Sequence, residues 1–135
     1  MRIKKIFSGV IILVVLLVFY NLLWFFVINP MMVSKSKKKI AKMDHYALLL
    51  SDCRKLMEDQ HDKEGTIYLE KKDLNKKIPE SILKLNPCSI SINKDNVYIC
   101  LHPFPRVGIV AFSKKDENKK FKYGKKCIQG LWSVP

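Results

Sequence analysis

The sequence predicts an α+β protein with one N-terminal transmembrane helix and a small domain, in which an amphipathic helix packs on an antiparallel sheet. Three patterns lead to this prediction. From Ile6 to Ile28, 20 of 23 residues are apolar. Apolar residues then recur every three or four positions from Ile40 to Met57, and alternate with polar ones between residues 88 and 101. The 135 residues leave room for one anchor and one domain of about 100 residues.

The apolar segment is long enough to cross a membrane. As a helix, Ile6–Ile28 would span roughly 34 Å, against a hydrocarbon core of about 30 Å. It is longer than the apolar core of a signal peptide and no small-residue cleavage pattern follows it, which favours an uncleaved signal anchor. Residues 1–5 would form a basic cytoplasmic tail. Aromatic side chains gather near the C-terminal end, as expected at a membrane interface: Tyr20, Trp24, Phe25 and Phe26.

Residues 29–39 form a predicted linker between the anchor and a domain at 40–135. Pro30 interrupts this segment, and its lysines are candidate contacts for an anion: Lys35, Lys37, Lys38 and Lys39. The net charge of +13 also suggests an anionic partner. Only three of the 25 basic residues are arginine, the residue that nucleic-acid readers favour for bidentate contacts, so specific nucleic-acid binding is not expected.

The charges on the two sides of the anchor give conflicting predictions of its orientation. Three basic residues precede it, and five lysines follow within 14 residues of its end. That count would keep the domain in the cytoplasm. A basic tail of five residues is hard to translocate, however, and long domains cross largely regardless of charge. We predict a single-pass protein of the inner (cytoplasmic) membrane, with its N-terminus in the cytoplasm and its domain in the periplasm or outside the cell.

The domain is predicted to contain one long helix, one short helix and several strands. The long helix has apolar residues from Ile40 to Met57 on one face, and the short helix starts at Pro79 and ends near Leu85. The predicted strands are Thr66–Leu69, a hairpin of residues 88–92 and 97–101, Val107–Phe112, Phe121–Tyr123 and Cys127–Val134, arranged as a meander.

The hairpin register follows from its apolar residues. Pairing Ile90 with Ile99 and Ile92 with Val97 builds one apolar face, and a slip of one residue would destroy it. In this register Cys88 points to the core and Cys100 points away.

The even number of cysteines suggests disulfides in an oxidising compartment, which would also favour a domain outside the cytoplasm. The four candidates are Cys53, Cys88, Cys100 and Cys127. Because Cys53 lies on the core face of the helix, the expected pairs are Cys53–Cys88 and Cys100–Cys127. Four free thiols in a reducing cytoplasm are the alternative. No C-x-x-C pair is present, so a zinc site is not expected.

Part of the domain resembles short bacterial proteins of unassigned function. The shared features are a proline-started turn in IPESILKLNP, a V-x-I hairpin in NVYIC and a late GLW, within residues 78–132. The resemblance implies a small α+β domain and supplies no catalytic residues.

The sequence lacks the patterns that would indicate an enzyme. All five glycines are isolated, and neither G-x-S-x-G nor H-E-x-x-H is present. Cys100 and His102 would share a strand face, but a disulfide at Cys100 is the more natural interpretation. We expect a non-catalytic, membrane-anchored envelope protein without cofactor or metal, which acts as a binding or accessory module. Its partner would be an envelope protein or an acidic polymer. The alternative is a cytoplasm-facing basic domain that binds anionic lipid or nucleic acid.

Overall fold

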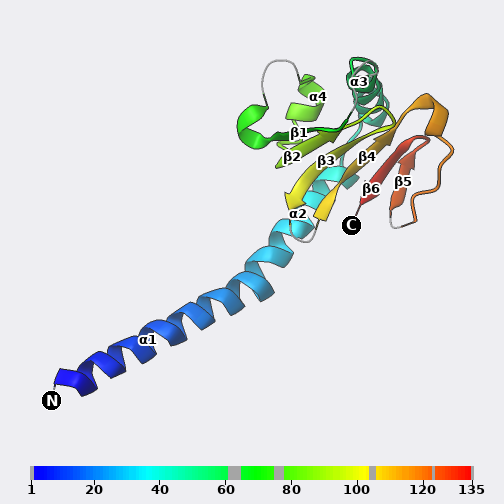
Figure 1. The fold of residues 1–135 in the computed structure, drawn as a ribbon. Helices are drawn as coiled ribbons and strands as arrows, with labels where there is room; N and C mark the ends of the chain where they lie inside the picture. The colour runs from blue at the N-terminus through cyan, green and yellow to red at the C-terminus, as the bar shows by residue number, and fades with distance from the viewer. Residues whose placement is uncertain (1, 61–64, 75–77, 104–105, 123, 135) are drawn as a thin grey trace. The chain divides into compact units, whose positions relative to one another are not determined.

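A computed structural model describes residues 2–60, 65–74, 78–103, 106–122 and 124–134. The chain divides into two compact units, Met1–Ser34 and Lys35–Pro135. The second unit is an α+β domain with a six-stranded antiparallel sheet (Figure 1). The predicted fold class is therefore confirmed at this level.

The N-terminal unit is helical. Helix α1 (Arg2–Leu23) continues through a π-helical turn, η1 (Trp24–Ile28), into helix α2 (Asn29–Ala41). The described chain contains one helix that is long and apolar enough to cross a membrane. Its large apolar side chains are exposed from Val10 to Val27. The Asn21 amide donates a hydrogen bond to the Leu17 carbonyl at 2.8 Å, so this polar side chain is satisfied within its own helix.

The structure differs from the predicted linker at residues 29–39, which are helical. Pro30 lies two residues after the π-helical turn η1, where the Asn29 N–H bonds to the Trp24 carbonyl and the regular α-helical hydrogen bonding is already interrupted. The lysines and Ala41 that follow are good helix formers. The second compact unit begins at Lys35, within helix α2.

The long helix predicted from Ile40 is divided in the structure. Helix α2 ends at Ala41, and helix α3 (Tyr46–Glu58) begins five residues later. The Tyr46 hydroxyl donates to the Ile40 carbonyl at 2.6 Å, which joins the two helices at the break. The apolar stripe therefore extends across two helices. Ile40 is buried at the end of α2, while the buried face of α3 consists of Leu49, Leu50, Cys53, Leu56 and Met57.

The sheet consists of strands β1 (Ile67–Glu70), β2 (Ser89–Ile92), β3 (Asn96–Pro103), β4 (Arg106–Phe112), β5 (Lys125–Ile128) and β6 (Leu131–Val134). Short turns η2 (Lys71–Asp73) and η3 (Lys114–Asp116) and helix α4 (Glu80–Leu83) complete the domain. Helices α3 and α4 lie on the same side of the sheet, and α3 packs on β3 and β4 (Figure 1).

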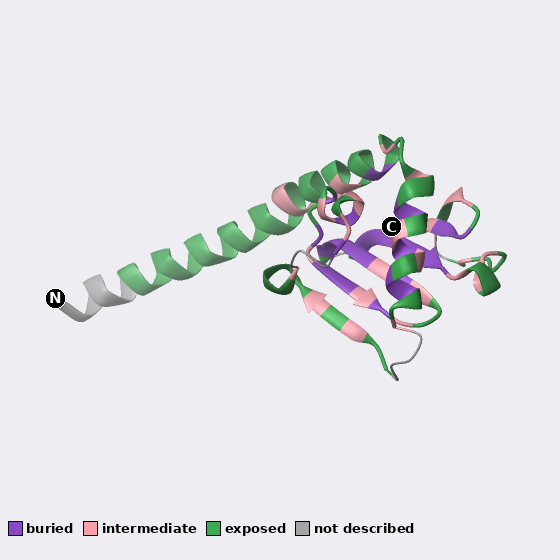
Figure 2. Cartoon of the chain, turned by 90° about the horizontal axis from the view of Figure 1, so that it is seen from above, coloured by how far each residue is buried: buried purple, intermediate pink, exposed green. Residues whose placement is uncertain are grey.

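The predicted hairpin register is confirmed. Ile90 pairs with Ile99 and Ile92 pairs with Val97, and all four side chains are buried. Val97 and Ile99 in turn pair with Ala111 and Ile109 of β4. Central strands are accordingly buried, whereas the edge strand β1 is largely exposed (Figure 2).

The meander is correct for β1 to β4 and wrong for the last two strands. The strand order is β1-β2-β3-β4-β6-β5, so β6 lies inside the sheet and β5 forms the edge. Gly130, at φ 83°, closes the two-residue loop between β5 and β6, a conformation that favours glycine. Leu131 of β6 is fully buried beside β4, while Lys125 and Lys126 of β5 are exposed. Apolar β6 therefore takes the inner position and lysine-rich β5 the edge, where lysines suit an exposed strand. The described part of the predicted strand at 121–123 is not a strand.

Gly108 is required by the close approach of β3. A Cβ atom there would meet the Ile99 carbonyl oxygen and, at 3.0 Å, the ring of Tyr98. We expect Gly108→Ala to lower the free energy of unfolding by about 1–3 kcal/mol, because backbone cannot move aside cheaply. In a domain of this size each kcal/mol lowers Tm by roughly 4–8 °C, which thermal unfolding of the full chain in detergent measures.

Ser91→Ala is the matched control for this prediction. Ser91 is half-buried and lies on the same face of the sheet as Gly108. Its replacement by alanine should change the free energy of unfolding by less than about 0.5 kcal/mol. Equal Tm values for Gly108→Ala and Ser91→Ala would contradict the packing described for β3 and β4.

Candidate anion-binding site

A cavity of about 520 Å³ lies between the last turn of α2, the start of α3 and the β5–β6 hairpin. Three lysines line it, Lys37 from α2 and Lys125 and Lys126 from β5. The remaining lining residues are two hydroxyl side chains, a thiol and three apolar side chains: Tyr46, Ser133, Cys127, Ile40, Ala41 and Val134. We call this the lysine cavity. Its lining combines positive charge with apolar surface.

Local structure fixes the positions of these groups. Lys125 pairs with Ser133 across the β5–β6 ladder, and the Ser133 hydroxyl donates to the Lys125 carbonyl at 3.1 Å. The ladder shifts register between Lys126 and Ile128, which places Cys127 at an irregularity. Tyr46 starts α3 and is held by its hydrogen bond to Ile40. The cavity therefore joins residues that lie about 90 positions apart in the chain.

The three lysines carry uncompensated charge. Elsewhere in the domain lysines pair with acids, for example Lys119 with Asp116 at 3.0 Å and Lys84 with Glu80 at 3.1 Å. Within the described ranges, none of Lys37, Lys125 and Lys126 forms an ion pair, and no acidic residue lines the cavity. Lysines grouped without counter-charge raise the local positive potential and attract an anion.

The structure separates the four lysines that the sequence suggested as anion contacts. Only Lys37 lines the cavity; Lys35 and Lys38 are exposed and do not. The Lys39 ammonium instead donates to the Leu85 carbonyl at 2.6 Å, just after α4. Sequence reasoning missed Lys125 and Lys126. Their signal was a lysine pair at the start of the last apolar segment, but its relation to α2 depends on the strand order.

The predicted disulfides are wrong, because all four cysteines are free. Cys53 is completely buried on the core face of α3. The thiols of Cys88 and Cys100 donate to the carbonyls of Leu101 and His102 at 3.3 and 3.4 Å, while Cys127 lies beside the Tyr46 hydroxyl. Cys100 points away from α3 as predicted, yet it is buried; Cys88, predicted to be in the core, is only half-buried.

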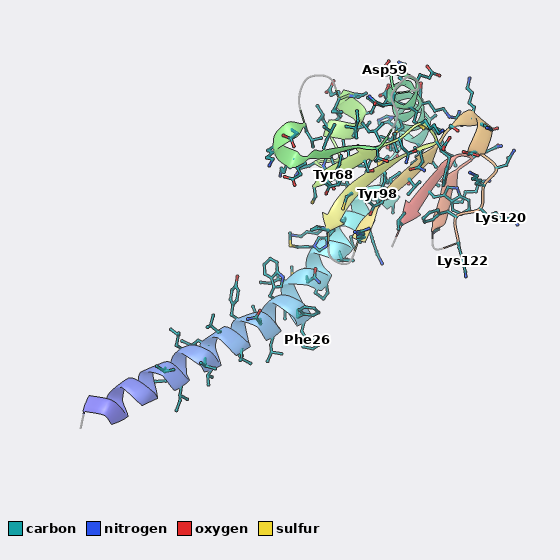
Figure 3. All side chains as sticks on the ribbon, viewed as in Figure 1. Phe26, Asp59, Tyr68, Tyr98, Lys120 and Lys122 are labelled. Atoms are coloured by element: carbon teal, nitrogen blue, oxygen red, sulfur yellow. The ribbon has the colours of Figure 1, made fainter. Side chains whose placement is uncertain are left out.

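The face of the sheet opposite α3 carries a row of side chains that crosses all six strands. The pairings align Tyr68, Ser91, Tyr98, Val110, Trp132 and Lys126 in this order. Tyr68 and Tyr98 project on this side (Figure 3), and Tyr68 is 62% exposed.

Two polar atoms in this row are buried without a hydrogen-bond partner in the described chain, the Tyr98 hydroxyl and the Trp132 indole nitrogen. Burial raises the pKa of Tyr98 to about 12, and the neighbouring Cys100 adds to the increase. The Cys100 thiol donates its own hydrogen bond to the His102 carbonyl.

The prediction that Cys100 and His102 share a strand face is wrong. A bulge in β3 pairs Cys100 with Gly108 and His102 with Val107. Because Val107 and Gly108 are adjacent positions on β4, they face opposite sides of the sheet, and so do the side chains of their partners His102 and Cys100. Within the described ranges, no group of three or more His, Cys, Asp or Glu residues could hold a metal ion.

No family model, curated protein or solved structure matches the chain. Lysine ammonium groups bind phosphate and carboxylate as point charges. The hydroxyls of Tyr46 and Ser133 already donate to backbone carbonyls, so charge, rather than hydroxyl donors, would hold an anion.

The free cysteines lead to a direct prediction. In denaturant without reductant, the full chain should take up four alkyl groups per molecule, as measured by intact mass. In the native protein at pH 8, Cys53 should stay unmodified, because burial, with a smaller contribution from Asp52, raises the pKa of its thiol to about 12. The Cys53→Ala variant, which should take up three groups in denaturant, is the control. A mass that reveals a disulfide would contradict the structure, as would native labelling of Cys53.

Proposed function

We propose that the chain is a single-pass membrane protein whose basic domain is a non-catalytic binding module for an anionic envelope component, either an acidic polymer or an acidic surface of an envelope protein. The positive charge of the lysine cavity carries this proposal, because the cavity would bind a single anionic group of such a component. The cavity offers three unpaired ammonium groups and apolar lining, a composition suited to holding a ligand.

The exposure of the apolar helix supports membrane anchoring. The large apolar side chains from Val10 to Val27 are between 40% and 74% exposed. Exposing apolar surface to water costs about 25 cal/mol of free energy per Å². A helix with this much exposed apolar surface is therefore more stable in lipid than in water. Tyr20, Trp24, Phe25 and Phe26 would then meet the interface at one end.

We further propose that the N-terminus is cytoplasmic and that the domain lies in the periplasm or outside the cell. A five-residue basic tail is difficult to translocate, and long domains cross the membrane largely regardless of charge. The free cysteines remove disulfides as an argument for this orientation.

Two observations favour a second candidate, a cytoplasm-facing domain that binds anionic lipid or nucleic acid. Five lysines follow the anchor, more than the three basic residues that precede it. The four thiols are free, as is usual in a reducing cytoplasm. In this orientation the basic domain would lie on the side of the membrane that carries the anionic inner leaflet.

A reporter fused after Pro135 distinguishes the two orientations. We expect the fusion to stay in the membrane fraction after an alkaline wash and to give alkaline phosphatase activity, because that enzyme folds only outside the cytoplasm. Fluorescence from a reporter active only in the cytoplasm would contradict the proposed orientation. Release by the alkaline wash would contradict the anchor itself.

A variant in which the five lysines Lys35, Lys37, Lys38, Lys39 and Lys42 are replaced by glutamine is the control. If the domain is outside, this change should leave the phosphatase signal unaltered. A domain retained in the cytoplasm by these charges should move outward when they are removed.

A further inference from the structure

The composition of the lysine cavity restricts what it can hold. Three ammonium groups stand beside apolar side chains from α2 and β6, including Ile40 and Val134. A fully hydrated inorganic ion would leave the apolar part unused, and a purely apolar ligand would bury unpaired charge at a high cost. The cavity therefore suits a ligand that carries a negative group and an apolar portion together.

The size of the cavity points to a small ligand. About 520 Å³ lies within the range of roughly 300–1,000 Å³ that is usual for small-molecule sites. It can take one head group, whereas a nucleic acid is bound through many phosphates along an extended basic surface.

The chain itself keeps a source of such ligands close by. Lys37 lies nine positions after Ile28, the last residue of the apolar segment. Nine residues of fully extended chain reach at most about 32 Å. A tether of this length gives a membrane ligand a high effective concentration, so a modest intrinsic affinity is sufficient.

We infer that the lysine cavity binds the phosphate group of an anionic phospholipid in the membrane that holds the anchor. Lys37, Lys125 and Lys126 neutralise the phosphate, and the apolar lining contacts the glycerol and the first acyl carbons. The inference rests on the proposed membrane anchoring and holds for either orientation, since both keep the cavity within chain reach of a lipid surface. A soluble phosphate compound shares the same anionic chemistry, so the test must separate the two sources.

Native mass spectrometry of the full chain in detergent tests this inference. The protein is titrated with phosphatidylglycerol and, separately, with phosphatidylcholine of the same acyl chains. We expect tighter binding of phosphatidylglycerol, and we expect K37Q/K125Q/K126Q to weaken it about tenfold, the combined effect of three partly exposed charge contacts. The corresponding arginine variant, K37R/K125R/K126R, should retain binding and shows that charge at these positions is what matters.

K94Q/K115Q/K120Q is the matched control, because it removes the same charge from three exposed lysines that do not line the cavity. It should bind phosphatidylglycerol like the unmodified chain. If both glutamine variants bind phosphatidylglycerol equally weakly, the effect comes from net charge alone and the inference is overturned. It is also overturned if neither variant binds more weakly than the unmodified chain. Displacement of the lipid by an equal concentration of glycerol phosphate would overturn the lipid as the source.

The result of this lipid-binding test can be distinguished from the result for the proposed membrane anchoring. Retention in the membrane fraction is measured on the same variants. If the chain stays in the membrane but shows no lipid preference, the cavity inference fails and the anchor stands. If the chain leaves the membrane fraction, the proposed anchoring fails, whatever the lipid titration shows.

Discussion

The register of the β2–β3 hairpin is the constraint on which the rest of the domain depends. Pairing Ile90 with Ile99 and Ile92 with Val97 directs all four side chains toward α3 and α4. A shift of one residue would turn them to the opposite face and bring Ser91 and Tyr98 inward. Strand β4 extends the same alternation through Ile109 and Ala111. The register therefore fixes which face of the sheet receives α3 and α4 and which face carries Tyr68 and Tyr98.

The burial of apolar side chains also explains the location of the lysine cavity. Leu131 belongs in the core beside β4, so β6 occupies the inner position and β5 is left at the edge. Lys125 and Lys126 are then placed at the end of the sheet, where the last turn of α2 brings Lys37. Arg54 of α3 holds the adjoining loop through a 3.0 Å ion pair with Glu117. The cavity thus results from ordinary core packing.

Local sequence patterns predicted much of this fold. The features that they did not predict depend on contacts between residues that are far apart in the sequence. Alternation identified the hairpin and its register, and Pro79 marked the start of α4. The break between Ala41 and Tyr46 was missed because the apolar stripe continues across it. The predicted disulfide pairs were wrong because the sequence pattern indicates the direction of each cysteine side chain but not the distance between two cysteines. Of the site residues, Lys37 was suggested by its lysine run, but Lys125 and Lys126 could not be linked to it before the order of β5 and β6 was known.

The central claim is that folding joins two distant lysine segments into one site that binds an anionic membrane ligand. Hydrogen–deuterium exchange of the full chain in nanodiscs, compared between anionic and zwitterionic lipid, tests it most directly. Because one ligand would contact both segments, residues 37–41 and 125–128 should exchange more slowly together in anionic lipid, while β1 at 67–70 should be unchanged. Slowing confined to residues 35–42, or spread equally over the domain, would contradict the claim.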